Sequence, residues 1–537
     1  PFMPFLDQEC FNKTLAKLIG PRSDDDVNIE ELKVVSRKDL AYLGTLLVVL
    51  RMLYLSLFVN KASVNEQRLV SEDPSPEAQE LKYLLSNPIS IDLIDLAQMC
   101  QNQFQVMRRN LLAVLQLCLF LRIYQSFAPE EGDAVDGSDA QISNATMVQM
   151  AFSMGLNRDP EKIEGMTCPR ENHLCRKIWW FLYNSSIFHS YSYGDPLFFL
   201  KSSADVKEPF FSPEGCNVED KDLDMHATQL YERCSSFIKP IAKLLTVLLD
   251  VNGRAKLSYV SKLLTTIEVD QYQKNGLLKD CLKQQLSSTK HSAVFRRNYQ
   301  IKVYFSLNVF LISLYFHFFL HYLDTDIALS FFYVKKMLLI NIQNFMPHYF
   351  ELLDGGENML DFIMNPLMEQ MVHKSNIVLL GLNTRVNNMM FSMMEDPNHI
   401  IRMENDSTYR LQFISLAKNS FLLKRCTEIS IAAISKISNR YYYAWKIMKS
   451  HTYLLQTIQD PEFYRKNRET FKNQSTTSYP NDYLQTLIEI LEKPVTKFSH
   501  IEQLAPQFCS TCPEAYMESE LQPLTQDLSY LHSKEVD

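Results

Sequence analysis

The fold is indicated most clearly by the stretch SNATMVQMAFSMGLNRDP (143–160), which is followed after a spacer by RKIWWFLYNSSIFHSYSYGDPLFFL (176–200). In each part, apolar side chains recur at three- and four-residue spacing, which predicts a buried stripe on each of two helices. The stripes contain Met147, Met150, Ala151 and Met154, and then Ile178, Trp179, Leu182 and Tyr183. The residues expected to end the helices are Gly155 and Pro160, and then Gly194 and Pro196. We therefore expect a pair of helices packed through large aromatic side chains.

The same periodicity extends through most of the chain and predicts an all-α fold. Glycine is scarce, at 13 of 537 residues, and few stretches alternate with period two, so a sheet is not indicated. We expect a large multi-helix domain, either bundled or solenoid-like. Ser143 and Asn144 are expected to cap the helix that follows them, and residues 68–79 read as a loop. The other main helices are expected at 37–59, 92–107, 222–249, 255–272, 327–350, 359–394, 408–449 and 484–491.

The domain organisation follows a change in composition late in the chain. Residues 1–460 carry the long apolar helices and are expected to form one helical domain. Residues 461–537 are more polar and end in an acidic stretch. We interpret them as a helical and acidic extension of the same domain.

Charge and cysteine content limit the class of protein. The formal net charge is −8, and the sequence has no stripe of basic residues that would contact phosphate groups. This chain is therefore not expected to bind nucleic acid itself. Its eleven cysteines are irregularly spaced, and several lie within apolar helical runs. Such a set suits the reducing cytosol or nucleus better than secretion.

The most apolar run, VYFSLNVFLISLYFHFFLHYL (303–323), is long enough to span a bilayer. It contains serine, asparagine and two histidines, and it lacks basic anchors on both sides. We therefore predict a buried core helix and no membrane span.

Two histidines of this run, His317 and His321, stand at i and i+4, a spacing that lets one helix face hold a metal. No acidic residue lies between them and no third ligand is indicated, so a structural or pocket-lining pair is favoured. If the domain has a ligand pocket, the hypothesis is that Phe305, Tyr315, His317 and His321 line it.

Two Cys-Pro dipeptides, at Cys168 and Cys512, raise the possibility of haem ligation by a thiolate. Cys512 also belongs to a solitary C-x-x-C with Cys509, which alone is a weak zinc or redox signal. Cys168 and Cys512 are the candidate haem ligands, and no metal site is predicted in this chain.

Sequence motifs of catalysis are missing. The sequence has no P-loop, no G-x-G-x-x-G after a strand and no G-x-S-x-G, and its histidines form no local signature with a serine or cysteine nucleophile. We predict that the chain is not an enzyme.

Three stretches carry a family resemblance. VQMAFSMGLNRDP (148–160) resembles an Ala-x-x-x-Gly-Leu-His-x-Asp segment in the regulatory, or middle-homology, domain of the fungal binuclear zinc-cluster transcription factors. RKIWWFLYNSSIFHSYSYGDPLFF (176–199) is similar to the family's Arg-Arg-x-x-Trp-Trp-x-x-Tyr segment, which ends in Gly-Arg-Pro, and PFMPFLDQECF (1–11) is similar to its domain opening. The opening and the YGDPL segment look closest to the yeast haem-responsive and oleate-responsive activators.

The chain departs from the family pattern at two places. Ser186 and Ile187 stand where the family has Asp-Arg, and Asp195 replaces the arginine of Gly-Arg-Pro. These departures put the family's usual internal salt bridges in doubt for this chain.

The resemblance implies a regulatory domain that controls RNA polymerase II transcription in the nucleus. It implies a six-cysteine zinc cluster N-terminal to Pro1 that binds DNA, a homodimer, and contacts with transcriptional co-regulators. The sensed ligand would be apolar, such as haem, a fatty acid, a sterol or a xenobiotic. The alternative is a helical protein-interaction scaffold that binds no small ligand.

Overall fold

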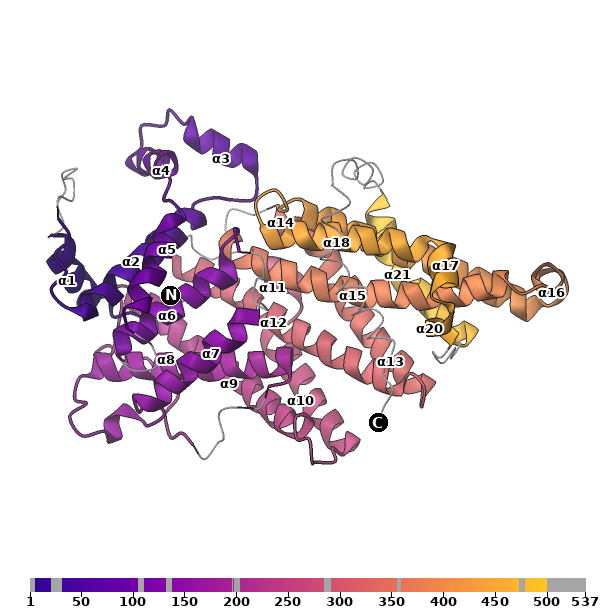
Figure 1. Ribbon diagram of the computed structural model, residues 1–537, viewed down its shortest axis with the longest axis horizontal. Helices are drawn as coiled ribbons and strands as arrows, with labels where there is room; N and C mark the ends of the chain where they lie inside the picture. The colour runs from indigo at the N-terminus through magenta and orange to yellow at the C-terminus, as the bar shows by residue number, and fades with distance from the viewer. Residues whose placement is uncertain are drawn as a thin grey trace. The chain divides into compact units, whose positions relative to one another are not determined.

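The computed structural model describes residues 5–20, 31–104, 111–131, 138–195, 197, 203–283, 291–354, 359–472 and 479–499 (Figure 1). Within these ranges the regular structure is helical throughout, without a strand, which confirms the all-α prediction. The chain divides into two compact units. Unit 1 contains Pro1–Tyr304 and Glu357–Pro366, and unit 2 contains Phe305–Gly356 and Leu367–Asp537. The boundary predicted at residue 460 lies inside unit 2.

Unit 1 is built from the helices of the first part of the chain and the beginnings of two long helices that continue into unit 2. Its helices are α1 (Gln8–Ile19), α2 (Arg37–Ser56), α3 (Ala62–Leu69), α4 (Pro76–Ser86), α5 (Asp92–Asn102), α6 (Leu112–Phe127), α7 (Ser138–Ser153), the 3-10 turn η2 (Pro160–Lys162), α8 (Pro169–Tyr193), α9 (Lys221–Leu248), α10 (Leu257–Asn275), α11 (Leu278–Lys283) and the first part of α12 (His291–Tyr322).

Unit 2 contains the rest of α12 and the helices that follow it. They are α13 (Ile327–Leu338), the π-helix η3 (Leu339–Phe345), the 3-10 turn η4 (Met346–His348), α14 (Tyr349–Leu353), α15 (Asp361–Met394) from Leu367 onward, α16 (His399–Asn405), α17 (Ser407–Ser435), α18 (Tyr442–Gln459), α19 (Pro461–Lys466), α20 (Arg468–Lys472) and α21 (Asn481–Lys497).

Helix α6 lies at the centre of the unit 1 core. Its sequence is apolar almost all round, and Leu115, Leu117 and Leu119 are fully buried, so neighbouring helices cover it on more than one side. Helix α2 packs on α5 and α6. It approaches α6 closely at Gly44, where an added Cβ would lie 3.0 Å from Leu117 Cδ2. Glycine permits this crossing because it has no side chain.

The predicted pair of aromatic-rich helices is α7 and α8, which pack against each other. Trp179 is 2% exposed and meets Phe152 edge to face, with ring centroids 5.4 Å apart. Gly155 and Gly194 follow the helices with φ of 72° and 74°, a conformation that glycine adopts without strain. Pro196 lies outside the described residues.

Three details of the expected helices are wrong. Helix α7 begins at Ser138, so Ser143 and Asn144 lie inside it, and Asn144 is buried. The loop expected at 68–79 contains the start of α4, because Ser75 accepts a hydrogen bond from the Ala78 amide and Pro76 occupies the first turn. The single helix expected at 408–449 is broken after Ser435, and a new helix starts at Tyr442.

In unit 2, α17 packs between α18 and α21. The Asn419 amide donates to the Leu484 carbonyl at 3.0 Å, and the Cys426 thiol to the Leu491 carbonyl at 3.7 Å. The two partners are 65 residues apart in both pairs, so a step forward along α17 corresponds to a step forward along α21. The two helices therefore run in the same direction. These contacts lie between buried residues and hold α21 on the core of this unit.

Two described helices, α2 and α12, are long and apolar enough to cross a membrane on length and composition alone, with mean hydropathy of 1.5 and 1.7 over their best windows. Core helices of globular proteins meet the same criterion. In α12, 61% of the window is buried inside the protein, as the sequence predicted for a core helix.

A buried carboxyl group distinguishes the core of unit 2. Glu369 on α15 is 2% exposed, and its Oε1 accepts a hydrogen bond of 3.1 Å from the Ala444 amide. Burial raises the pKa of Glu369 to about 8, although the hydrogen bond lowers it in part. The folded protein therefore holds this carboxyl group protonated over a pH range in which the unfolded chain has lost the proton.

We predict that Glu369→Gln stabilises the protein relative to the parent progressively as pH rises. Because the folded-state pKa is above the unfolded value, the parent loses stability between about pH 4.5 and pH 8, by up to about 1.4 kcal/mol per pH unit. Urea unfolding at pH 5, 6.5 and 8 measures the difference between the two proteins. Glu404→Gln, at an exposed position on α16, is the control. A difference for Glu369→Gln that does not change with pH would refute the prediction.

Candidate functional site

The four side chains proposed to line a ligand pocket all lie on α12 within unit 2. Phe305 is fully buried and meets Phe345 edge to face at 4.7 Å. Tyr315 is 2% exposed, and its ring lies 5.8 Å from that of Tyr333. Both aromatic side chains therefore pack against other rings of the same core.

The two histidines of that set lie elsewhere on the helix surface. His317 and His321 are both exposed, and the His321 ring meets the neighbouring Tyr322 ring edge to face at 4.8 Å. The structure thus divides the set into two buried rings and two exposed imidazoles. A ligand pocket formed by these residues stays a prediction.

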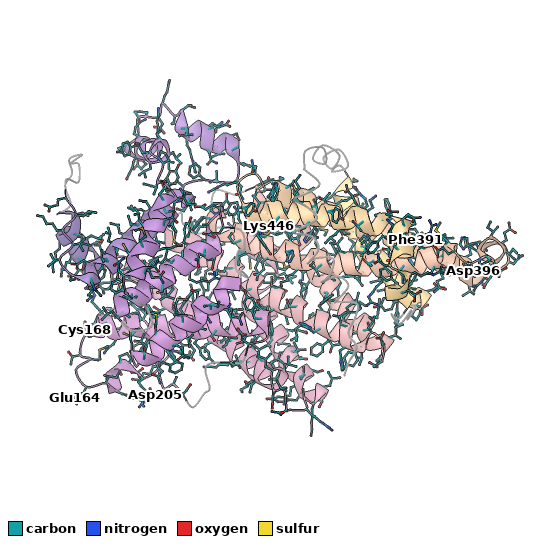
Figure 2. All side chains as sticks on the ribbon, in the orientation of Figure 1. Glu164, Cys168, Asp205, Phe391, Asp396 and Lys446 are labelled. Carbon is teal, nitrogen blue, oxygen red and sulfur yellow. The ribbon has the colours of Figure 1, made fainter. Side chains whose placement is uncertain are left out.

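Cys168, one of the two candidate haem ligands, is an exposed residue at the start of α8. Figure 2 labels it near Glu164, close to the margin of the ribbon. Cys512 lies outside the described residues. Among the residues that are described, no group of three or more histidine, cysteine, aspartate and glutamate side chains could hold a metal ion. Haem ligation stays a prediction.

A network of charged side chains lies along α8, and the sequence did not predict it. Lys177 is fully buried, and its Nζ contacts Asp224 on α9 and donates to Asn217 Oδ1 at 3.2 Å. Asp224 is itself 2% exposed. Burial lowers the pKa of Lys177, and the nearby Asp224 carboxylate offsets only part of this effect.

His173, one turn before Lys177, also faces Asp224, with Nε2 3.3 Å from Oδ2. Burial alone would raise the pKa of Asp224, but His173 and Lys177 outweigh it and hold the pKa below its usual value. Burial lowers the pKa of His173. Asp224 is therefore a buried carboxylate whose charge is balanced chiefly by Lys177.

Arg176 makes a second buried ion pair, with Asp159 in the turn before α8. Its Nη2 and Nε lie 2.7 Å and 3.1 Å from the two carboxylate oxygens, and Asp159 is fully buried. Asp159 also accepts a hydrogen bond of 2.9 Å from the Lys207 amide. Burial raises the pKa of Asp159, but the Arg176 and backbone hydrogen bonds outweigh this and hold it low. This pair ties residues 159 and 207 to α8.

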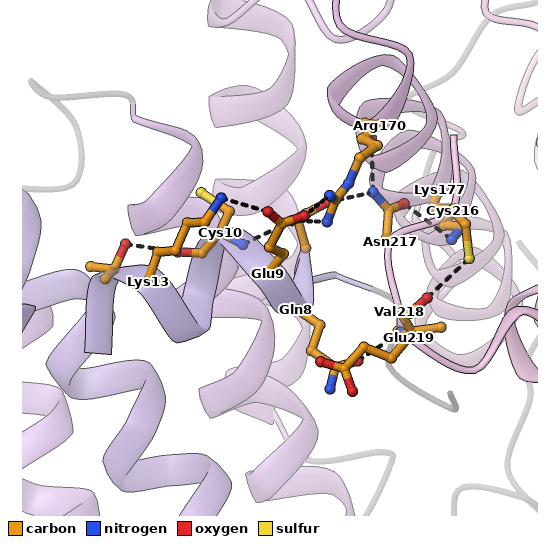
Figure 3. Close-up of polar contacts among 12 residues, drawn as sticks. Gln8, Glu9, Cys10, Lys13, Arg170, Lys177, Cys216, Asn217, Val218 and Glu219 are labelled. Carbon is orange, nitrogen blue, oxygen red and sulfur yellow. Dashed lines mark hydrogen bonds and ion pairs between the residues drawn. The ribbon is translucent and has the colours of Figure 1, made fainter. Parts of the chain in front are cut away.

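Arg170 connects the start of α8 to the N-terminal segment (Figure 3). Its Nη2 and Nε lie 2.6 Å and 2.9 Å from the carboxylate oxygens of Asp7. Asn217 donates to Asp7 at 3.1 Å and to the Arg170 carbonyl at 2.8 Å. Asn217 is also the residue that accepts from Lys177, so the contacts of Arg170 and Lys177 are continuous.

Together these contacts form what we call the α8 network, defined by Asp7, Asp159, Arg170, His173, Arg176, Lys177, Asn217 and Asp224. It fixes to one helix the N-terminal segment at Asp7, the turn at Asp159 just before the helix, and the segment from Asn217 to Asp224. Its charges are paired within the fold, which suits holding a conformation rather than catalysis.

The positions at which the chain departs from the family pattern lie close to this helix. Ser186 and Ile187 are both buried in α8, each 1% exposed. Asp195 accepts a hydrogen bond of 2.6 Å from Gln141 on α7. Asp195 therefore links α8 to its partner helix through a neutral amide.

Comparison with known proteins gives one family. Residues 1–303 match the family described as the fungal specific transcription factor domain. The chain is 42% identical over 512 residues to Multidrug resistance regulator 1 of Candida albicans, covering 95% of this chain and 46% of that protein. It is also 27% identical over 192 residues to Oleate-activated transcription factor 1 of Saccharomyces cerevisiae, covering 34% of this chain and 17% of that protein. The chain thus spans less than half the length of these relatives. No solved structure matches.

Proposed function

This chain belongs to the fungal specific transcription factor domain family, and we propose that it is the regulatory, or middle-homology, domain of a zinc-cluster transcription factor that controls RNA polymerase II transcription. The family is one of transcription factors and not of enzymes, in agreement with the prediction from sequence. The observation that carries the proposal is the match over residues 1–303, which includes every residue of the α8 network.

The proposal assigns DNA binding to a six-cysteine zinc cluster N-terminal to Pro1. The net charge of −8 supports this division, because a chain without a basic stripe is poorly suited to contact the DNA backbone. The protein would act in the nucleus as a homodimer and contact transcriptional co-regulators. Sequencing the transcript upstream of the Pro1 codon tests the assignment. We expect it to encode a six-cysteine motif, and a long upstream reading frame without such a motif would contradict the proposed DNA binding.

We also propose that the domain responds to a ligand by a population shift. An apolar molecule such as haem, a fatty acid, a sterol or a xenobiotic would prefer one packing of the helices and so change the exposure of an activation segment. The names of two relatives, a multidrug resistance regulator and an oleate-activated factor, support this class of ligand. Saturation at one hundred times Kd would stabilise the folded chain by about 2.7 kcal/mol. Thermal unfolding with haem and with oleate measures this effect, and unchanged melting with both would count against sensing of either ligand.

A protein-interaction scaffold is the second candidate function, and the surface of α16 and α17 favours it. Ile400 and Ile401 on α16 are 72% and 59% exposed. On α17, Leu411, Ile414 and Phe421 recur at helical spacing and are more than half exposed. A cluster of exposed apolar side chains marks a site for contact with another protein. A ligand-free chain that still binds co-regulators through this surface would support the scaffold.

A further inference from the structure

Helix α2 of unit 1 is apolar on two opposite sides, and the fold buries only one of them. The buried side carries Ala41, Gly44, Thr45, Val48, Met52 and Leu55. The other side carries five leucines, spaced alternately three and four residues apart, which we call the leucine stripe: Leu43, Leu46, Leu50, Leu53 and the C-cap residue Leu57. Leu50 and Leu53 are 37% and 59% exposed, and the other three are partly buried.

The spacing of the leucine stripe is that of a seam between two packed helices. Apolar residues that alternate three and four positions apart keep facing a partner helix along their whole length. A helix that is apolar all round is normally buried inside a protein. Only 33% of the apolar window of α2 is buried, against 61% for α12. Within the part of the chain that the structure describes, the leucine stripe is therefore left partly open to solvent.

Helix α5 extends the same apolar surface. An added Cβ at Gly44 of α2 would lie 3.2 Å from Cys100 Cβ near the end of α5. Further along α2, the Arg51 guanidinium donates to the Ile89 carbonyl just before α5, so the two helices run antiparallel. Leu96 lies one turn before Cys100, on the side of α5 that faces α2, and it is 47% exposed. Leu96 is therefore level with the middle of the leucine stripe.

The two ends of this surface carry opposite charges. Arg37 and Lys38 are exposed at the start of α2, and Asp92 and Asp95 are exposed at the start of α5. Because the helices are antiparallel, the basic pair and the acidic pair lie toward opposite ends of the two-helix layer. None of the four side chains makes an ion pair within the described residues. The nearby Asp39 is engaged in capping α2, since it accepts from the backbone amide that precedes the helix.

We propose that a second copy of this chain covers the leucine stripe, with the two α2 helices packed antiparallel about a twofold axis. Such an axis places the same surface on both copies. It brings the basic start of α2 in one copy toward the acidic start of α5 in the other, so the surface is complementary to itself. The stripe is roughly 20 Å long and supplies the apolar centre of the contact, while the charged pairs form its rim. This contact specifies the homodimer of the proposed function.

Sedimentation of the full 537-residue chain over a range of concentrations tests the contact. We expect a reversible equilibrium between monomer and dimer. Leu50→Glu combined with Leu53→Glu should weaken dimerisation by about a hundredfold or more, because it places charges in an apolar contact. The matched control is Val269→Glu combined with Tyr272→Glu on α10, two residues that are 44% and 66% exposed at the same three-residue spacing. The control should dimerise as the parent does.

Charge reversal tests whether the partner is a second copy in this orientation. One variant chain carries Asp92→Lys and Asp95→Lys, and the other carries Arg37→Glu and Lys38→Glu. Each chain alone should dimerise about tenfold more weakly than the parent, because like charges then meet across the twofold axis. A mixture of the two chains should form heterodimers at least as stable as the parent dimer, since opposite charges face each other again.

Three results would overturn the proposal. They are a chain that stays monomeric at all concentrations, a dimer that the two glutamates at Leu50 and Leu53 do not weaken, and heterodimers no more stable than the dimers of either charge-reversed chain. Monomers that bind phospholipid vesicles through α2 would also overturn it, because the leucine stripe would then face lipid. A monomeric chain leaves the regulatory function standing, since that function is tested separately by the sequence upstream of Pro1.

Discussion

Lys177→Met is expected to lower the free energy of unfolding by about 3–5 kcal/mol, because removing one partner of a buried ion pair leaves the other charge uncompensated. Lys177 is fully buried, and Asp224 beside it is 2% exposed, so water cannot replace the lost ammonium group. Asn217 would lose its contact with Lys177 at the same time. Urea unfolding followed by circular dichroism measures the loss.

Two comparisons make this prediction specific. Lys239→Met removes a lysine that is 57% exposed from its pair with Glu208, and it should change stability by less than about 1 kcal/mol. The double variant Lys177→Met with Asp224→Leu should be less destabilised than the sum of the two single variants, since it removes both charges. A Lys177→Met protein as stable as the parent would show that α8 does not depend on this pair.

Trp179→Ala should have a second effect of similar size, a loss of about 3–5 kcal/mol, since it removes a large side chain from a packed core. Trp179 contacts Phe152 across the interface between α7 and α8, and its neighbours cannot fill the cavity left behind without moving. The same unfolding measurement applies.

The adjacent tryptophan supplies the matched control. Trp180 is only partly buried and donates from Nε1 to the Lys207 carbonyl at 2.9 Å. Trp180→Ala should therefore cost clearly less than Trp179→Ala. Equal losses for the two variants would contradict the packing described for this pair of helices.

The helical fold could be predicted from sequence because apolar periodicity is a local signal. The long helices α2, α9 and α15 begin and end close to the expected residues, whereas α12 begins twelve residues before the apolar run at 303–323. The break between α17 and α18 was missed because the intervening residues, KISNRY (436–441), include no glycine or proline to mark a helix end. Burial of charge was also missed, since Lys177 and Asp224 are 47 positions apart and only the tertiary fold brings them together.

The candidate sites show the same limit. The pattern of α12 identified Phe305 and Tyr315 as apolar, and both are buried, but it could not tell which helix face the histidines occupy. A cavity beside α6 is lined by glutamines and an asparagine from α5 and α6 and by a serine from α7, and no spacing within one helix marks such a set. The sequence RKIWW (176–180) carried a signal for the buried charges, because Arg176 and Lys177 directly precede the apolar residues of the helix. Their buried aspartate partners could not be identified from sequence.

We propose that this chain regulates a transcription factor without itself binding DNA. Chromatin immunoprecipitation combined with transcript profiling tests it in the native cells, comparing the intact protein with one from which residues 1–537 have been deleted. We expect the intact protein to be enriched at promoters, and the deleted protein to keep that enrichment while its target genes no longer respond to the inducing condition. Background occupancy of the intact protein at all promoters, or an unchanged transcriptional response after the deletion, would contradict the claim.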